Sequence, residues 1–323
     1  MINDIYLKLT ETVKEGTILR NEPLFRYTTF KTGGPADILV IPANVGELKE
    51  TILLAKETET PYYIIGNGSN LLVSDDGFRG IVIAVRNADG DISIRAERSV
   101  TYGEAADTEV PDAERGAFIL TADAGCPLSK VAYTAARAGL KGLEFAAGIP
   151  GSLGGAVFMN AGAYGGEIKD CISSAEVMDT DGNVFTLNHD ELDLSYRHSA
   201  VGDRGLIVLK ASFRLYPGST EDILATIQDL NARRRDKQPL EYPSAGSTFK
   251  RPEGYFAGKL IEDAGLRGFA VGGACVSEKH CGFVINKGGA TSADILKLIG
   301  EVSERVYISS GVRLEPEVRM LGF

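Results

Sequence analysis

Two glycine-rich tracts in separate parts of this 323-residue chain constrain its fold more than any other feature. The first, residues 66–71, directly follows an apolar segment typical of a strand, and the second occupies residues 146–166. Backbone N–H groups in such loops can converge on a phosphate, because glycine lets the main chain approach closely and adopt positive φ. The first tract lacks the last glycine of G-x-G-x-x-G and the second lacks Gly-Lys-Ser/Thr, which disfavours Rossmann and Walker-type sites. A tight turn explains either tract alone, but the pair favours a large phosphorylated ligand lying between domains.

The composition is that of an ordinary globular protein, with 44% hydrophobic and 24% charged residues. A formal net charge of −10 makes a nucleic-acid partner unexpected. The one basic run is residues 233–235, followed by Lys237. It is either the solvated end of a helix, where cations suit the helix dipole, or a site for a phosphate or carboxylate.

Neither a metal centre nor a disulfide framework is expected. The cysteines show no CxxC spacing and the histidines are scattered along the chain. The N-terminal sequence shows no signal-peptide pattern, and no apolar run reaches membrane-spanning length. We therefore expect a cytoplasmic protein with reduced thiols and no membrane insertion, and we expect it to be a monomer.

Hydrophobic periodicity predicts three regions of mixed helix and strand. In the first, we expect a helix over 45–57 and strands over 36–41, 61–65 and 80–85. The second begins with a polar stretch, 87–116, that suits a surface hairpin or a partly mobile excursion. After it we expect a helix over 127–138, two strands around the Asp181–Gly182 turn, and strands over 117–123 and 206–216.

The third region begins with an expected helix over 220–235 and contains a short helix over 256–264. Strands are expected around Ala274 and Phe283. A helix over 292–309 carries its apolar residues on one face, with Thr291 and Asp294 as a capping pair. A last strand is expected over 312–321.

A second group of residues could act on a substrate that carries a carboxylate. Tyr196–Arg197, Ser247 and Glu317 supply a cation, a proton donor and a carboxyl group, which suit a reaction that builds charge on a substrate carboxylate and then protonates carbon. Alone, Ser247 is explained as a loop serine, Arg197 as a salt-bridge arginine and Glu317 as a strand-edge acid. Ser247 also lacks the flanking glycines of a hydrolase G-x-S-x-G elbow. Sequence spacing leaves open whether these side chains meet.

An ordered set of motifs carries a resemblance to one family. The motifs are Thr28-Thr-Phe-Lys-Thr-Gly-Gly-Pro-Ala36, Gly66-Asn-Gly-Ser-Asn-Leu-Leu72, Gly148-Ile-Pro-Gly-Ser-Leu-Gly-Gly155, Asn160-Ala-Gly-Ala-Tyr-Gly165, Tyr196-Arg197, Pro243-Ser-Ala-Gly-Ser-Thr-Phe-Lys250 and Leu314-Glu-Pro-Glu-Val-Arg319. Together they resemble the UDP-N-acetylenolpyruvoylglucosamine reductase family, in the family's order, from about residue 20 to residue 323. The order of the set, rather than any single motif, makes the resemblance specific.

The resemblance implies an α+β protein with the FAD-binding fold of the vanillyl-alcohol-oxidase type. Its two FAD-binding subdomains would be 1–85 and 86–217, and a C-terminal α+β substrate domain would be 218–323, with the last strand returning to the active site. FAD would be the cofactor and NADPH the reductant. The FAD-contacting residues implied by the motifs are Gly66, Asn67, Gly68, Ser69, Asn70, Leu71, Ala147, Gly148, Ile149, Pro150, Gly151, Ser152, Gly154, Gly155, Asn160, Ala161, Gly162 and Ala163.

The implied reaction reduces the enolpyruvyl group of UDP-N-acetylglucosamine enolpyruvate to give UDP-N-acetylmuramate, a step of peptidoglycan precursor synthesis. By motif matching, Ser247 donates the proton to carbon, while Arg197 and Glu317 polarise the substrate carboxylate. Tyr196 and Lys237 match substrate-binding positions, and we add Lys250 from its place beside the serine turn.

The chain resembles the family's shorter form, because it passes from residue 166 directly into a new strand and has no counterpart of the tyrosine-bearing substrate loop. Arg251 stands where relatives often carry asparagine. Two alternatives stay open: an alcohol or sugar oxidase on the same FAD fold, and a UDP-sugar- or flavin-binding protein without catalysis.

Overall fold

The computed structural model describes residues 2–87, 89–97 and 116–323. The chain forms two compact units. Unit 1 comprises Met1–Pro42, Leu54–Ala84 and Arg234–Phe323, and unit 2 comprises Ala43–Leu53 and Val85–Arg233. The finer division into three domains with boundaries after residues 85 and 217 stays a prediction.

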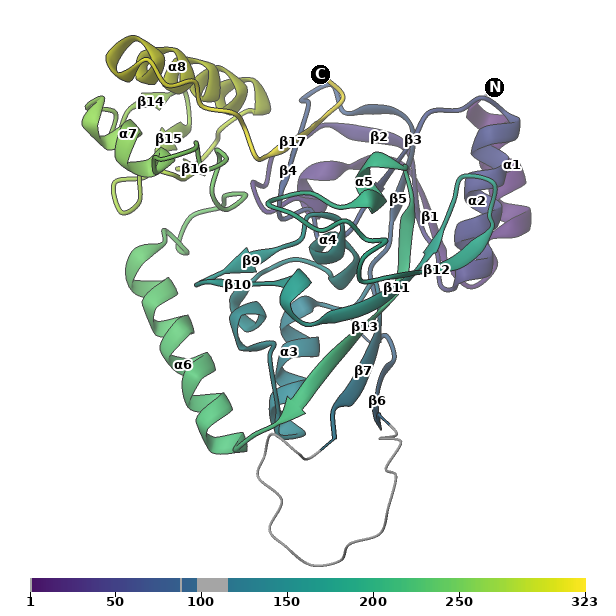
Figure 1. Ribbon diagram of the computed structural model, residues 1–323. Coiled ribbons are helices and arrows are strands. Elements are labelled where there is room, and N and C mark those ends of the chain that lie inside the picture. Colours follow the sequence, from purple (N-terminus) through teal and green to yellow (C-terminus); the bar gives the residue numbers. More distant parts are fainter. Residues whose placement is uncertain (1, 88, 98–115) are drawn as a thin grey trace, which may run out of the picture. The chain divides into compact units, whose positions relative to one another are not determined.

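Unit 1 contains a four-stranded sheet in the order β1-β2-β5-β3 (Figure 1). Its strands are β1 (Thr17–Pro23), β2 (Pro35–Ile41), β5 (Phe78–Ala84) and β3 (Tyr62–Ile65). β5 lies parallel to both β2 and β3, and β1 is antiparallel to β2. The two central strands bury apolar residues in unbroken runs, as parallel strands covered on both faces do. This confirms the strands predicted near 36–41, 61–65 and 80–85.

The N-terminal region of the chain also contains helices. The helix predicted over 45–57 is α2 (Val45–Glu57). A further helix, α1 (Ile2–Thr12), which buries Ile5 and Leu9, was not predicted, and neither was the strand β1. A short 3-10 helix, η1 (Leu24–Tyr27), follows β1.

A second part of unit 1 is a three-stranded antiparallel sheet packed on a long helix. The strands are β14 (Ala270–Val271), β15 (Ala274–Val276) and β16 (Val284–Asn286), and the helices are α7 (Ala257–Asp263) and α8 (Ser292–Ser310) (Figure 1). The predicted apolar face of α8 is buried, and the predicted capping box at Thr291 and Asp294 is present. The hydrogen bond from the Thr291 backbone amide lowers the pKa of the Asp294 carboxyl.

The last segment of the chain returns to the first part of unit 1. β17 (Arg319–Leu321) pairs in parallel with β4 (Leu71–Val73), which follows the first glycine-rich tract. In addition, both carboxylate oxygens of Asp75 accept hydrogen bonds at the start of α8, from the amides of Ser292 (2.8 Å) and Ala293 (2.9 Å). These contacts make the two parts of unit 1 one compact body.

The prediction of a continuous last strand over 312–321 was wrong. The segment forms only β17 and, before it, an isolated bridge between Pro316 and Phe249. Proline has no N–H to give to a ladder, so Pro316 interrupts regular pairing. The Glu317 amide still bonds the serine turn at the Thr248 carbonyl, and the chain changes partner to the β4 side at Arg319, whose amide donates to the Asn70 carbonyl.

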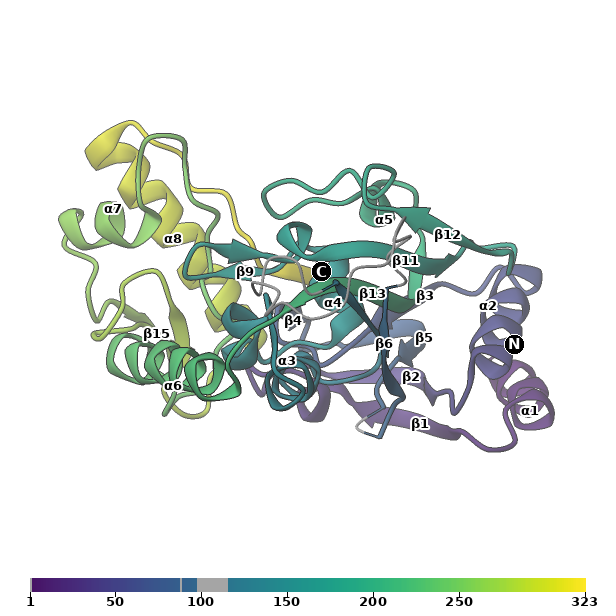
Figure 2. The ribbon, with the colours of Figure 1, turned by 60° about the horizontal axis from the view of Figure 1, so that its bottom comes forward.

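Unit 2 is built on an antiparallel sheet in the order β12-β11-β13-β7-β6 (Figure 2). Its strands are β12 (Val184–Asn188), β11 (Ile172–Met178), β13 (Ile207–Pro217), β7 (Phe118–Asp123) and β6 (Ile92–Ala96), with the short β8 (Leu140–Lys141) also paired to β13. β6 belongs to the predicted polar excursion and forms a hairpin partner for β7. The rest of that excursion, residues 98–115, lies outside the described residues.

Helices α3 (Leu128–Arg137) and α4 (Leu153–Phe158) contribute to the core of unit 2. α3 buries a stripe of small residues and leucine, which permits close packing. α6 (Thr220–Lys237), predicted over 220–235, buries only Ile223 and Ile227 and is otherwise polar.

Candidate active site

The serine turn, residues 243–250, is fixed by its backbone while Ser247 stays exposed. Gly246 has φ +76°, which confirms the need for glycine before the serine. The next residue, Thr248, is fully buried: its amide donates to the Gly282 carbonyl (2.9 Å) and its Oγ1 accepts from the Val284 amide (2.9 Å). Ser247 therefore sits on a turn whose following residue is held by two hydrogen bonds.

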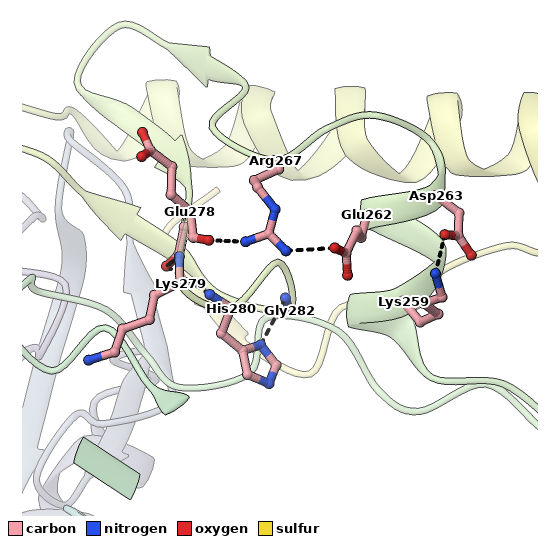
Figure 3. Close-up of polar contacts among 9 residues, drawn as sticks. Lys259, Glu262, Asp263, Arg267, Glu278, Lys279, His280 and Gly282 are labelled. Atoms are coloured by element: carbon pink, nitrogen blue, oxygen red, sulfur yellow. Dashed lines mark hydrogen bonds and ion pairs between the residues drawn. The ribbon is translucent and has the colours of Figure 1, made fainter. Parts of the chain in front are cut away.

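Residues 280–282 support this turn from the adjoining loop (Figure 3). The Nδ1 atom of His280 accepts the Gly282 amide (3.1 Å), and burial lowers the pKa of the His280 imidazole. Because Nδ1 is an acceptor here, the neutral ring carries its proton on Nε2. Nearby, Arg267 bonds the Glu278 carbonyl and the Glu262 carboxylate. The loop whose Gly282 carbonyl accepts the hydrogen bond of the Thr248 amide is thus held in turn by a neutral histidine.

The structure brings the segment of Glu317 alongside the serine turn, within unit 1. The Glu317 amide donates to the Thr248 carbonyl (2.8 Å) and the Lys250 amide to the Glu315 carbonyl (2.8 Å). The Lys250 ammonium lies 2.6 Å from a Glu315 carboxylate oxygen. The side chain of Glu317 is half-buried. Its main chain is paired with Thr248, the residue that follows Ser247.

The first glycine-rich tract joins the same group of segments. The Asn70 side-chain amide donates to the Glu317 carbonyl (3.0 Å), and the Asn70 carbonyl accepts from the Arg319 amide (3.0 Å). Gly68 has φ +60°, and a Cβ there would lie 1.9 Å from the Tyr27 carbonyl oxygen, so only glycine fits. Three motifs that are distant in the sequence therefore meet at one place in unit 1.

The same tract presents two consecutive backbone amides, those of Gly68 and Ser69. Within the described part of the chain, the amides of Gly68 and Ser69 donate no hydrogen bond, although the carbonyl of Gly68 accepts from Thr29 (3.1 Å). Consecutive amides at a positive-φ turn can bind an anion.

The second glycine-rich tract uses most of its amides internally. It forms the 3-10 helix η2 (Glu144–Gly148), then α4, then β9 (Gly162–Ala163). The amides of Leu153 and Gly154 donate to the carbonyls of Cys126 (2.9 Å) and Ala124 (2.8 Å). Among the residues that the structure describes, no group accepts from the amides of Gly151 and Ser152. The amides of Gly151 and Ser152 are therefore available to a ligand, and the FAD contacts of this tract stay a prediction.

Tyr196 and Arg197 form a two-residue turn in unit 2. Ser195 and His198 flank it and exchange backbone hydrogen bonds of 3.2 and 3.1 Å. Arg197 has φ +56°, and its guanidinium carbon lies 5.0 Å from the centre of the Tyr196 ring. His198 bonds the Asp203 carboxylate (2.8 Å) and the Asp193 carbonyl (3.0 Å), and its hydrogen bond to Asp203 raises its pKa.

The other predicted substrate residues lie in unit 1. Lys237 is exposed at the last position of α6. The Arg251 Nε donates to the Tyr255 carbonyl (3.2 Å), and its guanidinium carbon lies 4.0 Å from the centre of the Phe256 ring. The residues missed from the sequence are Thr248 and Asp75, whose roles depend on partners far along the chain. For Thr248, the sequence signal was its position directly after the serine; its burial is seen in the structure.

Within the described ranges, no cluster of histidine, cysteine or acidic side chains could hold a metal ion. In the same ranges, no helix has the length and apolar character needed to cross a bilayer.

The chain matches the family model described as FAD binding domain over residues 36–188. A second model, UDP-N-acetylenolpyruvoylglucosamine reductase, C-terminal domain, matches residues 238–321. These two matches define an FAD-containing oxidoreductase with an FAD-binding domain and a C-terminal domain of this reductase type.

Relatives define the family further. UDP-N-acetylenolpyruvoylglucosamine reductase of Agathobacter rectalis is 53% identical over 99% of both chains. That of Lachnoclostridium phytofermentans is 52% identical over 100% of this chain and 98% of its own. The crystal structure of the enzyme from Thermus caldophilus superposes with a TM-score of 0.73 at 34% identity, covering 95% of this chain and 99% of that one. The chain belongs to the UDP-N-acetylenolpyruvoylglucosamine reductase family.

Proposed function

We propose that this chain catalyses the NADPH-dependent reduction of UDP-N-acetylglucosamine enolpyruvate to UDP-N-acetylmuramate, with FAD as cofactor, in peptidoglycan precursor synthesis. The observation that carries the proposal is the meeting of the Ser247, Glu317 and Asn70 segments in unit 1. This meeting supports the proposal because it joins the main chains that carry Ser247 and Glu317 to the glycine-rich turn that ends at Asn70. Full-length similarity to enzymes of this name supports the choice of substrate.

The chemistry that bound FAD supplies is hydride transfer from NADPH to the methylene carbon of the enolpyruvyl ether. Negative charge then develops at the adjacent carbon and in its carboxylate. We assign to Gly68, Ser69, Gly151 and Ser152 the amides that hold the cofactor's phosphates. The other motif-implied residues of the two glycine-rich tracts, Asn160 excepted, complete the proposed FAD site.

Ser247 is the proposed proton donor to that adjacent carbon. A serine hydroxyl is ordinarily a very weak acid, but its partner is a strongly basic, carbanion-like centre, so transfer is feasible. The exposed side chain and fixed backbone of Ser247 suit this role, because a proton donor must be placed within hydrogen-bond reach of the reacting atom. The resulting alkoxide must be reprotonated before the next turnover.

Arg197 and Glu317 are the proposed groups that polarise the substrate carboxylate. Tyr196, Lys237 and Lys250 are the proposed substrate contacts. Lys250 is held by Glu315, so this acid would orient its ammonium. Location in the cytoplasm and a monomeric state stay predictions, and analytical ultracentrifugation tests the second.

The decisive experiment separates the two half-reactions. The purified protein should be yellow, and NADPH should bleach its flavin absorbance under anaerobic conditions. Mixing the reduced protein with the enolpyruvyl sugar should restore the absorbance quickly, whereas oxygen should restore it slowly. Fast reoxidation by oxygen with none by the sugar would indicate an oxidase. Ligand binding without NADPH turnover would indicate a non-catalytic protein.

A further inference from the structure

The turn that carries Arg197 needs support beyond its own hydrogen bonds. A non-glycine residue in the left-handed region costs about 1 kcal/mol or more, and Arg197 is there with φ +56°. The flanking bridge between Ser195 and His198 closes only one small ring, and Tyr196 is exposed. The surrounding structure must therefore hold this conformation.

Asn160, in the second glycine-rich tract, makes a contact that helps to hold the backbone of the arginine turn. Its side-chain nitrogen donates to the Ser195 carbonyl (2.9 Å) and to the Glu167 carboxylate (2.9 Å), and its oxygen accepts the Lys169 amide (2.9 Å). The residue is fully buried. A carbonyl can only accept and an amide N–H can only donate, so these partners fix which end of the Asn160 side chain is nitrogen.

Glu167 and Lys169 keep this network charged and in place. The Lys169 ammonium lies 2.9 Å from the Glu167 carboxylate. The hydrogen bond from Lys169 lowers the pKa of Glu167, with further contributions from Asn160 and from the charge of Arg197. Glu167 is therefore an anion that accepts from Asn160. A Cβ on Gly162 would lie 2.7 Å from the Glu167 Cγ, which explains why this position of the tract is glycine.

We propose that Asn160 is a positioning residue for Arg197, rather than a contact of FAD. Both of its side-chain hydrogens are used inside the protein, one of them on the residue before the turn. The amide thereby links the glycine-rich tract to the arginine that acts on the substrate carboxylate. This inference rests on the proposed function and adds a residue to it.

The test is Asn160→Asp, which keeps the shape of the side chain but replaces both N–H donors with an oxygen. Misplacing a catalytic group by about 1 Å costs on the order of 100-fold in rate, so we expect about that loss in reoxidation of the reduced flavin by the enolpyruvyl sugar. Flavin content and flavin reduction by NADPH should not change. The matched control is Asn183→Asp, because Asn183 also donates its side-chain amide to a carboxylate, Asp179 Oδ2 (2.9 Å), in an exposed hairpin turn.

A double mutant decides whether Asn160 acts through Arg197. If it does, adding Asn160→Asp to Arg197→Ala should slow the sugar half-reaction no further, because residues acting as a unit are not additive. Multiplicative losses in the double mutant, or loss of flavin in Asn160→Asp, would overturn the proposal. If Arg197→Ala alone leaves the sugar half-reaction intact, the role given to Arg197 under the proposed function fails, and the proposal for Asn160 fails with it.

Asn160→Gly is a second variant that tests the proposal if Asn160→Asp does not fold. Asn160 has φ +44°, a conformation that glycine adopts without strain, so this variant removes the side chain but not the backbone geometry. It should reproduce the loss seen with Asn160→Asp. Full activity in Asn160→Gly would overturn the proposal.

Discussion

The two turns that present Ser247 and Arg197 are held in different ways. The serine turn is fixed by main-chain hydrogen bonds to segments 282–284 and 315–317 and by the Thr248 hydroxyl, and glycine at 246 takes the left-handed conformation. In the arginine turn the functional residue itself takes that conformation, and the side chain of Asn160 holds the preceding carbonyl. The turn of the proposed proton donor is thus held by segments distant in the sequence, whereas the arginine turn is also held by a buried side-chain amide.

The largest effect should come from Ser247→Ala. Loss of a general acid typically costs about 10²- to 10⁴-fold, so reoxidation of the reduced flavin by the enolpyruvyl sugar should slow by that order, while flavin reduction by NADPH continues. Stopped-flow absorbance measures both. Ser244→Ala, in the same turn, is the control and should react normally. Equal losses in both half-reactions would instead give Ser247 a structural role.

Thr248→Val should lower the free energy of unfolding by weakening the serine turn. The substitution removes the acceptor of the buried Val284 amide, and an unsatisfied buried group costs about 1–3 kcal/mol. Denaturant unfolding measures the free energy of unfolding. Thr226→Val is the matched control, because the Thr226 hydroxyl donates to the Asp222 carbonyl (2.9 Å) on an exposed helix face. Equal stability of the two variants would show that the Thr248 hydroxyl does not hold the turn.

Strain in the arginine turn can be measured directly. Arg197→Gly and Arg197→Ala both remove the guanidinium, but only glycine adopts φ +56° freely. The glycine variant should therefore be more stable than the alanine variant by about 1 kcal/mol, and both should fail with the sugar. At Gly246 the same order should hold, since Gly246→Ala introduces the same strain into the serine turn and should lower its stability. Unfolding free energies that do not differ between Arg197→Gly and Arg197→Ala would argue against strain.

The smallest expected effect is a pH dependence of opposite sign in the two regions. Near the arginine turn, the hydrogen bond to Asp203 raises the pKa of His198, so its stabilisation is complete below about pH 6.5 and is lost as pH rises through the raised pKa. Beside the serine turn, burial lowers the pKa of His280. Its stabilisation is complete above about pH 6.5 and is lost as pH falls through the lowered pKa.

Thermal midpoints of His198→Gln and His280→Gln across pH check this contrast. The deficit of the first variant relative to the unsubstituted protein should shrink as pH rises, and that of the second should shrink as pH falls. Parallel profiles would contradict the assigned hydrogen-bond roles of the two rings.

Local patterns in the sequence predicted most of the fold. The capping box and apolar stripe of α8, the length of α2 and the buried runs of β2 and β5 follow from short-range periodicity. The last strand was overpredicted, because its pattern continues from residue 312 to 321 while its hydrogen-bonding partner changes between Glu317 and Arg319. The pattern of apolar residues along a segment does not indicate where that segment changes its hydrogen-bonding partner.

The candidate site was less predictable. Motif order predicts Ser247, Arg197 and Glu317 as site residues, but the residues that support them in the structure carry no such signal in the sequence. Asn160 reads as one more residue of a glycine-rich loop, and only the fold reveals that its amide bonds Ser195. Thr248 reads as part of a turn, and its burial depends on segments 282–284 and 315–317.

The pairing of β17 with β4 affects how the chain must be made. Asn70 and Glu317, which bond one another, are 247 residues apart, and contacts of such separation form late in folding. While the ribosome is still adding the C-terminal region, Leu71, Leu72 and Val73 have no partner strand, although all three are buried in the finished protein. An unpaired apolar edge is a site of aggregation, so β4 is the segment that a chaperone would have to protect during synthesis.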